Sequence, residues 1–176
     1  MRIEQEYTAA IVVDYQEKLV PVMSDKEQLI HNSEILLKGL KILEVPMYIT
    51  QQYTKGLGTS VKEITDAVED VAYTDKLSFT AYDCVADKIS SKKYIIVCGI
   101  EAHICVLQTV IDLKAAGFVP VLVSDCISSR KDSDKQVAIE RARQEGAIVT
   151  TYESMLFELL KVAGTETSKK IQKLIR

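Results

Sequence analysis

The sequence is short of the features that mark membrane, secreted and metal-binding proteins. No apolar run approaches the roughly 20 residues of a membrane-spanning helix. The N-terminus, MRIEQEYTAAIVVD, places acidic residues before a short apolar segment, unlike a secretory signal. The only two histidines, His31 and His103, form no HxxxH or HExxH pattern, and the four cysteines include no CxxC pair. We therefore expect a cytoplasmic protein with reduced thiols, no metal and no cofactor.

A strong charge of either sign is also missing. The 22 basic and 25 acidic residues give a formal net charge of −3, and no long block of one sign occurs. Binding to nucleic acid or to a membrane through a basic face is therefore disfavoured. The glycines of KGLGTS complete no phosphate-binding motif, because neither GxGxxG spacing nor a following GK[ST] is present.

What the sequence does contain is enough apolar material for one sizeable core. Hydrophobic residues make up 47% of the 176 positions, which suits a single domain spanning residues 1–176. Most of the expected strands are nearly continuous apolar runs, as in a parallel sheet that helices cover on both faces. The expected strands are residues 8–13, 46–50, 71–74, 94–99, 119–124 and 147–151.

Helical spacing separates most of these strands. The expected helices are residues 26–43, 104–116, 133–145 and 154–162, with Ser24 or Asp25 as the cap of the first and Gly117, Gly146 and Gly164 at left-handed C′ positions of the others. Such alternation predicts an α/β fold: a three-layer α/β/α sandwich with a mainly parallel, doubly wound, Rossmann-like sheet of about six strands. Residues 165–176 form a basic amphipathic tail, which we expect to pack on the domain or on a neighbouring subunit.

Sheets of this kind bind ligands at the carboxyl ends of their strands, near the point where the strand order reverses. That rule selects Asp14 after the first strand, residues 51–53 after the second, residues 99–105 after the fourth and residues 125–130 after the fifth. We expect these polar groups, which are far apart in sequence, to lie along one edge of the sheet.

Cys105 is the most informative of these residues. A thiol in the first turn of a helix lies near unpaired backbone N–H groups and the positive end of the helix dipole, both of which favour the thiolate. A buried cysteine is also a common apolar filler, which is our interpretation of Cys98. Position alone leaves both interpretations of Cys105 open.

Asp14 and Lys76 complete a candidate constellation. Asp14 follows the apolar run AAIVV, where it either caps the next segment or stands at the sheet edge. A carboxylate beside a thiol can accept its proton and return it to a leaving amine. Most lysines are solvated, but Lys76 lies in YTDKLSFTAYD among apolar and aromatic residues, where it could stabilise a carboxylate and a thiolate together.

Other polar residues carry weaker signals. His103 lies two positions from Cys105, a spacing at which side chains on a helix do not face each other, so we expect it to have a structural role or to stand at the rim of the site. Asp125 and Arg130 fit a salt bridge at the edge of the sheet or a subunit contact equally well.

The motifs VVDYQEKL, DKLSFTAY, GIEAHICVLQTVIDL, SDCISSR and TTYESMLFELL, in this order over nearly the whole chain, resemble the isochorismatase-like cysteine hydrolase family. The stretch QQYTKGLG is similar to its isochorismatase-domain-containing branch. The resemblance implies an isochorismatase-like hydrolase fold and an Asp-Lys-Cys triad. In it Asp14 is the proton acceptor and donor, Lys76 orients both partners, and Cys105 is the nucleophile.

The resemblance also implies a cis peptide between Ile100 and Glu101 and an oxyanion hole formed by the backbone N–H groups of Glu101 and Cys105. We further expect substrate contacts from Gln16, Tyr53 and Ile100. Ala102 replaces the threonine of many members. Thr-Gln-Gln-Tyr occupies the region where the nicotinamidases hold a metal, so metal-assisted nicotinamidase activity is not expected.

Two functional hypotheses follow. The first is a metal-independent hydrolase that cleaves a C–N bond of a small amide-like molecule through a covalent acyl-thioenzyme. The second is a slow or inactive isochorismatase-like protein that serves binding or assembly. Nuclease activity, attached by name to some relatives, has little physical support in this sequence. Family members commonly associate, so a homo-oligomer, dimer or tetramer, is expected.

Overall fold

A six-stranded sheet, all of whose strands are parallel, forms the centre of the computed structural model, which describes residues 1–69 and 71–176. The strand order is β3-β2-β1-β4-β5-β6, with every neighbouring pair parallel. This confirms the predicted doubly wound α/β fold. The strands are β1 (Thr8–Val13), β2 (Met47–Gln52), β3 (Tyr73–Lys76), β4 (Tyr94–Ile100), β5 (Val119–Ser128) and β6 (Ile148–Thr150).

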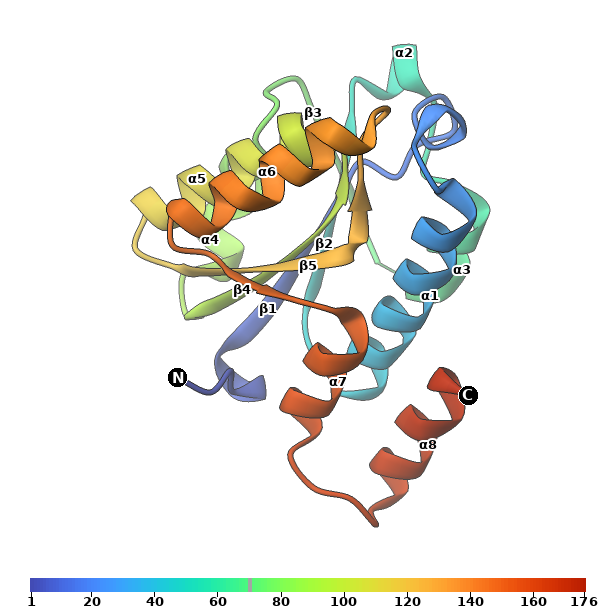
Figure 1. Ribbon diagram of the computed structural model, residues 1–176, viewed down its shortest axis with the longest axis vertical. Coiled ribbons are helices and arrows are strands. Elements are labelled where there is room, and N and C mark those ends of the chain that lie inside the picture. The colour runs from blue at the N-terminus through green and yellow to red at the C-terminus, as the bar shows by residue number, and fades with distance from the viewer. Residues whose placement is uncertain (70) are drawn as a thin grey trace.

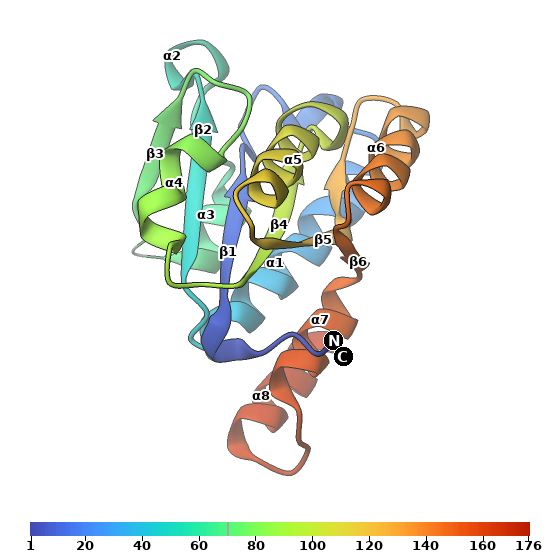
Figure 2. The same cartoon turned by 90° about the vertical axis from the view of Figure 1, so that its left-hand side faces the viewer.

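Helices cover both faces of the sheet (Figures 1 and 2). In Figure 2, α4, α5 and α6 lie in front of the sheet, and α1 and α3 lie behind it. Each face buries its own apolar cluster. The helices are α1 (Lys26–Ile42), α2 (Thr54–Leu57), α3 (Lys62–Val68), α4 (Tyr82–Ile89), α5 (Leu107–Ala115), α6 (Asp132–Gln144), α7 (Tyr152–Leu160) and α8 (Glu166–Ile175), with short turns η1 (Gln5–Tyr7) and η2 (Val20–Val22) and a π-helix, η3 (Ala102–Val106).

The apolar runs explain the central strands. Every residue of β1 and of β4 is buried, because helices cover both sides of these two strands. The predicted bounds of β1 are confirmed, whereas β5 continues four residues beyond the expected Ser124, to Ser128, past an irregularity in its pairing with β4. Helices α2, α3 and α4 were not predicted, since each is short and buries at most three side chains.

The strand order reverses between β1 and β4, which places the switch point beside Asp14. Gly99 lets the two strands approach closely there. Its φ is +129°, and a Cβ on it would lie 2.0 Å from the backbone oxygen of Val13. Any larger residue at position 99 would therefore force apart the two strands that carry the candidate site.

The ends of the helices partly match expectation. Gly117, Gly146 and Gly164 all have positive φ, as predicted. Asp25 is the residue before α1, but it has a left-handed conformation (φ +48°) and its side chain makes no capping hydrogen bond, so the expected cap is wrong for Asp25. The tail helix α8 packs on α1 and α7 through buried Ile171, as predicted for a tail that packs on the domain. Within residues 1–69 and 71–176, no helix has the length and hydropathy to cross a membrane.

Candidate active site

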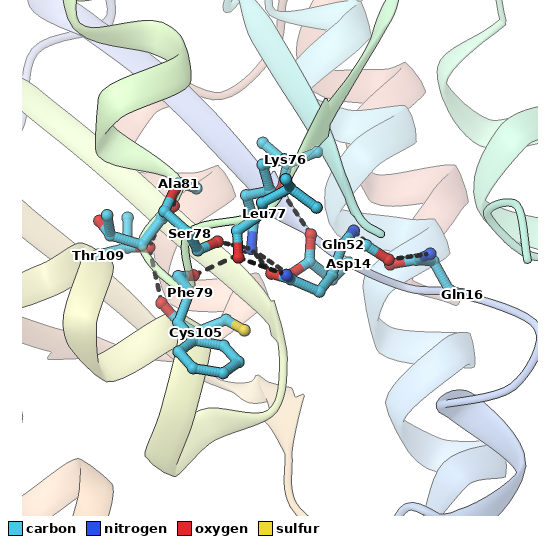
Figure 3. Close-up of polar contacts among 12 residues, drawn as sticks. Asp14, Gln16, Gln52, Lys76, Leu77, Ser78, Phe79, Ala81, Cys105 and Thr109 are labelled. Atoms are coloured by element: carbon cyan, nitrogen blue, oxygen red, sulfur yellow. Dashed lines mark hydrogen bonds and ion pairs between the residues drawn. The ribbon is translucent and has the colours of Figure 1, made fainter. Parts of the chain in front are cut away.

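Asp14 and Lys76 form a buried ion pair at the carboxyl edge of the sheet (Figure 3). Asp14 directly follows β1 in a left-handed conformation (φ +53°), and Lys76 is the last residue of β3. The Lys76 Nζ lies 2.7 Å from the Asp14 Oδ2, and neither side chain is exposed. Thr50, from β2 between them, donates a hydrogen bond of 2.8 Å to the Asp14 Oδ1. Of the two roles considered for Asp14, the structure therefore supports a residue at the sheet edge, which forms an ion pair, and not a cap.

The Lys76 ammonium also contacts three oxygen acceptors besides Asp14. Nζ donates to the Gln52 Oε1 at 2.6 Å, to the Phe79 carbonyl at 2.9 Å and to the Ser78 carbonyl at 3.2 Å. The Asp14 Oδ2 lies beside this ammonium, and among the residues that the structure describes it has no other hydrogen-bond partner. It lies beside a positive charge and can still accept a proton.

Cys105 supplies the third group, from η3 at the end of β4. Its side chain lies on the side that faces the Asp14–Lys76 pair in Figure 3. The pKa of the Cys105 thiol is raised to about 12, mainly by burial; the Asp14 carboxylate also raises this pKa and Lys76 lowers it. Position in the first turn of a helix favours a thiolate, but burial outweighs the cation and leaves the thiol pKa raised.

The pKa of Asp14 is also raised, because burial outweighs the opposing effects of Lys76, Thr50 and Cys105. Asp14 and Cys105 each influence the other's pKa, so the thiol and the carboxylate interact directly. The resting state supported by these shifts is a protonated thiol beside a carboxylate that can take its proton.

The loop before Cys105 contains a cis peptide between Ile100 and Glu101, as the resemblance implied. The Glu101 carbonyl accepts hydrogen bonds from the amides of Ile104 and Val106. In the described parts of the chain, neither the Glu101 amide nor the Cys105 amide donates to a backbone carbonyl through a bond outside the helices and strands. These two amides remain the predicted donors of an oxyanion hole.

Thr109 connects this loop with α4. Its hydroxyl donates to the Cys105 carbonyl at 2.7 Å and accepts from the Ala81 amide at 2.9 Å (Figure 3). Thr109 is completely buried. One side chain thus ties η3, α5 and the start of α4 together around the thiol.

Two neighbours of the loop have structural contacts. The Glu101 carboxylate accepts from the backbone N and from Nε of Arg130, both at 3.1 Å, so Arg130 pairs with Glu101 rather than with Asp125. Asp125 instead accepts from the amide of Tyr152 at 2.9 Å. His103 Nδ1 lies 2.8 Å from the Ser129 hydroxyl, in keeping with the structural role expected for His103.

The three residues expected to contact substrate differ in their surroundings. Gln16 is completely buried and its side chain bonds to the backbone of Gln52 and Gly58, so it connects the segment after β1 with the end of β2 and with the turn at Gly58. Ile100 is also fully buried, within the core cluster on the α1 side, so its side chain offers no surface to a substrate. Tyr53 is 49% exposed and remains a predicted contact.

Sequence reasoning missed the roles of Thr50 and Gln52. Both occupy the carboxyl end of β2, and the positional signal was available, since that end was expected to lie on the ligand-binding edge. No group of three or more histidine, cysteine or acidic side chains suited to a metal ion occurs among the described residues. What the arrangement can do is move a proton between sulfur, carboxylate and a bound molecule.

The family model described as Isochorismatase domain matches residues 8–154. The chain belongs to this isochorismatase family. It is 34% identical to isochorismatase domain-containing protein 2A of Mus musculus over 99% of this chain and 85% of the mouse protein. It is also 34% identical to the secreted isochorismatase effector Isc1 of Phytophthora sojae, over 99% and 87% of the two chains.

Solved structures agree with this family assignment. A structure described as MAR1 ribonuclease from Caenorhabditis elegans matches with a TM-score of 0.95 and 34% identity, over 99% of this chain and 92% of that one. A protein of Escherichia coli described as an octameric hydrolase of unknown specificity matches with a TM-score of 0.90 and 22% identity, over 99% and 90%. At that identity the second match supports the fold alone.

Proposed function

We propose that this isochorismatase-family protein is a metal-independent cysteine hydrolase that cleaves a C–N bond in a small amide-like molecule. The observation that carries the proposal is that Asp14, Lys76 and Cys105 lie together in a buried site, where Asp14 Oδ2 can accept a proton. The triad assigned by family resemblance and the contacts of these three side chains support the same roles.

Acylation begins with the protonated thiol. As the Cys105 sulfur attacks the substrate carbonyl carbon, the Asp14 carboxylate takes the S–H proton and the carbonyl oxygen becomes an oxyanion. The C–N bond then breaks while Asp14 passes its proton to the departing nitrogen. The products of this half-reaction are a free amine and a thioester on Cys105.

Deacylation repeats these steps with water. Asp14, again a carboxylate, takes a proton from the water that attacks the thioester carbonyl. The C–S bond breaks, the sulfur recovers the proton from Asp14, and the carboxylic acid leaves. Lys76 keeps its charge throughout and stabilises the carboxylate form of Asp14.

The oxyanion of both intermediates needs hydrogen-bond donors fixed in advance. The amides of Glu101 and Cys105 are our candidates, because the family resemblance implies this role and both lie in the segment that carries the nucleophile. The Glu101 carboxylate, held by Arg130, fixes the loop from the other side.

The remaining expectations belong to the same proposal. The reaction as written needs no metal or cofactor, since Asp14 makes every proton transfer. The homo-oligomer expected from the family resemblance is part of the same proposal. We keep a cytoplasmic location as a proposal, although one relative is described as a secreted effector.

Turnover of a panel of small primary and secondary amides tests the function. We expect at least one amide to be hydrolysed, and Cys105→Ala to abolish that hydrolysis. Cys84→Ala is the matched control, because Cys84 is a partly exposed thiol on neighbouring α4. Full turnover by Cys105→Ala would contradict the proposal. Because one similar structure is described as a ribonuclease, a single-stranded RNA is included. Cleavage of RNA alone, or binding without turnover, would also contradict it.

A further inference from the structure

Thr50 is a neutral polar residue in direct contact with Asp14, and the mechanism above gives it no role. It lies on β2, is completely buried, and is paired with Val13, the residue of β1 that precedes Asp14. Its hydroxyl donates to the Asp14 Oδ1 at 2.8 Å, and its carbonyl accepts from the Asp14 amide at 3.2 Å. Asp14 is thus held to β2 at two points, one in its backbone and one in its side chain.

The side-chain contact matters because the chain turns at Asp14. Strand β1 ends at Val13, and Asp14 has a left-handed conformation with a φ of +53°. Side chains of a strand point alternately to the two faces of the sheet, but a residue beyond the end of the strand does not follow this alternation. The direction of the Asp14 carboxylate therefore depends on the groups that contact it.

The two oxygens of the Asp14 carboxylate are held from two different strands. Oδ1 accepts from the Thr50 hydroxyl on β2, and Oδ2 lies 2.7 Å from the Lys76 Nζ on β3. A contact to one oxygen alone would leave the carboxylate free to turn about its Cβ–Cγ bond. Contacts to both oxygens fix the plane of the group, and that plane determines where its lone pairs point. Without the Thr50 hydroxyl, this hold on Oδ1 would be lost.

The hydroxyl of Thr50 is itself held in a fixed direction. A β-branched side chain has a restricted χ1 angle, so the backbone of the strand largely determines where its hydroxyl points. That backbone is fixed on both sides, because Thr50 is paired with Val13 of β1 and with Thr74 of β3. The donor to Asp14 is therefore in place before any substrate binds.

We propose that Thr50 is a positioning residue that fixes the Asp14 carboxylate in the orientation in which it takes the Cys105 proton. The donated hydrogen bond also stabilises the carboxylate form of Asp14, in the same direction as Lys76 and against burial. Thr50 keeps its own proton throughout, so it acts through Asp14 alone. The inference rests on the proposed function, because it assigns a role relative to the same triad.

The charged and titratable groups that interact with Asp14 come from three elements. Lys76 faces it from β3 and Cys105 from η3, while Cys84 on α4 interacts with it at longer range. Thr50 carries no charge. Replacing Thr50 by an uncharged residue therefore changes Asp14 through the lost hydrogen bond and not through a new charge.

Alkylation of Cys105 by iodoacetamide, followed across pH by peptide mass spectrometry, tests this role without any substrate. Thr50→Val removes the hydroxyl and keeps the shape of the side chain, whereas Thr50→Ser keeps the hydroxyl and removes the methyl group. Thr8→Val is the matched control. Thr8 is also completely buried, but it lies at the opposite end of β1 from Asp14, where its hydroxyl donates to the Glu4 carbonyl at 2.7 Å.

For Thr50→Val we expect two changes. The midpoint of the profile, which is the pH at which the rate is half its neutral value, rises by about one unit, because the carboxylate loses a hydrogen bond to its charged form. The neutral rate falls about threefold or more, because a carboxylate that can turn is less often oriented toward the thiol. Thr50→Ser keeps both values near those of wild type, and Thr8→Val leaves them unchanged.

An unchanged profile in Thr50→Val, or equal changes in Thr50→Val and Thr50→Ser, would overturn the inference. A higher midpoint with an undiminished neutral rate would also overturn it, because the hydroxyl would then act on the charge of Asp14 and not on its orientation. Should Thr50→Val fail to fold, Thr50→Ala takes its place, since it also lacks the hydroxyl. Wild-type values in Thr50→Ala would likewise overturn the inference.

These outcomes are separable from the proposed function. The expected alkylation pattern without amide turnover would contradict the hydrolase alone. Amide turnover with an unaltered alkylation profile in Thr50→Val would contradict the role of Thr50 alone.

Discussion

At the scale of single residues, the site depends on two acids whose protonation is set by burial. The Cys105 thiol has a pKa raised to about 12, and the pKa of the Asp14 carboxyl is raised as well. Both shifts have desolvation as their main cause, with Lys76 opposing each one. The nucleophile is therefore activated by transfer of its proton to Asp14 at the moment of attack, and not by a standing thiolate.

Replacing Lys76 by Met should move the acid limb of the Cys105 alkylation profile to higher pH. The acid limb is the pH range in which the alkylation rate falls as the pH drops. Asp14 must be ionised to take the thiol proton, so the rate falls as the pH drops through the Asp14 pKa. Lys76 lowers that pKa, and its removal raises it further. The measurement is the iodoacetamide rate between acid and neutral pH. Lys170→Met, at an exposed position of α8, is the control and should leave the limb in place. A limb that moved to lower pH would be incompatible with this role of Lys76.

Asp14→Asn should have two effects of opposite sign. At neutral pH the alkylation rate should fall by about 10²- to 10⁴-fold, the usual contribution of a general base. The alkaline rise of the rate should move below its wild-type position, because the carboxylate that raises the thiol pKa is gone. A full pH profile of iodoacetamide reactivity measures both. A neutral-pH rate equal to wild type would show that Asp14 is not the proton acceptor.

At the scale of elements, the site is assembled from segments that neighbour one another only in the folded sheet. Asp14 comes from β1, Lys76 from β3, and Cys105 from the π-helix after β4. The close approach of β1 and β4 at Gly99 and the hydroxyl of Thr109 hold these pieces in register. The geometry of the triad therefore depends on side chains that no reacting molecule touches.

Thr109→Val should lower the free energy of unfolding by about 1 to 3 kcal/mol, because it leaves the buried Ala81 amide without its acceptor. Thr109→Ser keeps the hydroxyl and should cost only about 1 kcal/mol for the lost methyl group. Urea unfolding of both variants measures the difference. Equal losses of stability would mean that packing, and not the two hydrogen bonds, explains Thr109.

At the scale of the whole molecule, the sequence predicts the fold better than the side-chain contacts of the site. The apolar runs of β1 and β4 predict central parallel strands, and the rule for strand ends brings Asp14 and Cys105 onto one edge. Lys76 was selected only for its apolar and aromatic surroundings. Helices α3 and α4 are too short for their spacing to stand out. The acceptors of Lys76 could not be read from sequence, because they depend on how the end of β2 lies against β3 and on backbone carbonyls of residues 78 and 79. The protonation state of the Cys105 thiol could not be predicted from sequence either, because it depends on how deeply the fold buries residue 105.

The assembly state is a prediction at the same scale. We expect light scattering coupled to size exclusion to give a multiple of the 19.7 kDa chain mass. Exposed apolar side chains beside Lys76, among them Leu77 and Phe79, favour association because they leave nonpolar surface in water. A monomer mass at micromolar concentration and above would contradict the expected homo-oligomer.

The covalent intermediate is the most direct test of the account as a whole. Acid quenching during hydrolysis of an active amide, followed by intact-mass measurement and peptide mapping, should reveal the acyl group as a thioester on Cys105. Cys105→Ala should form no adduct and consume no amide, and Cys84→Ala should match wild type. Consumption of the amide with the acyl group on another residue, or with undiminished turnover in Cys105→Ala, would contradict the account.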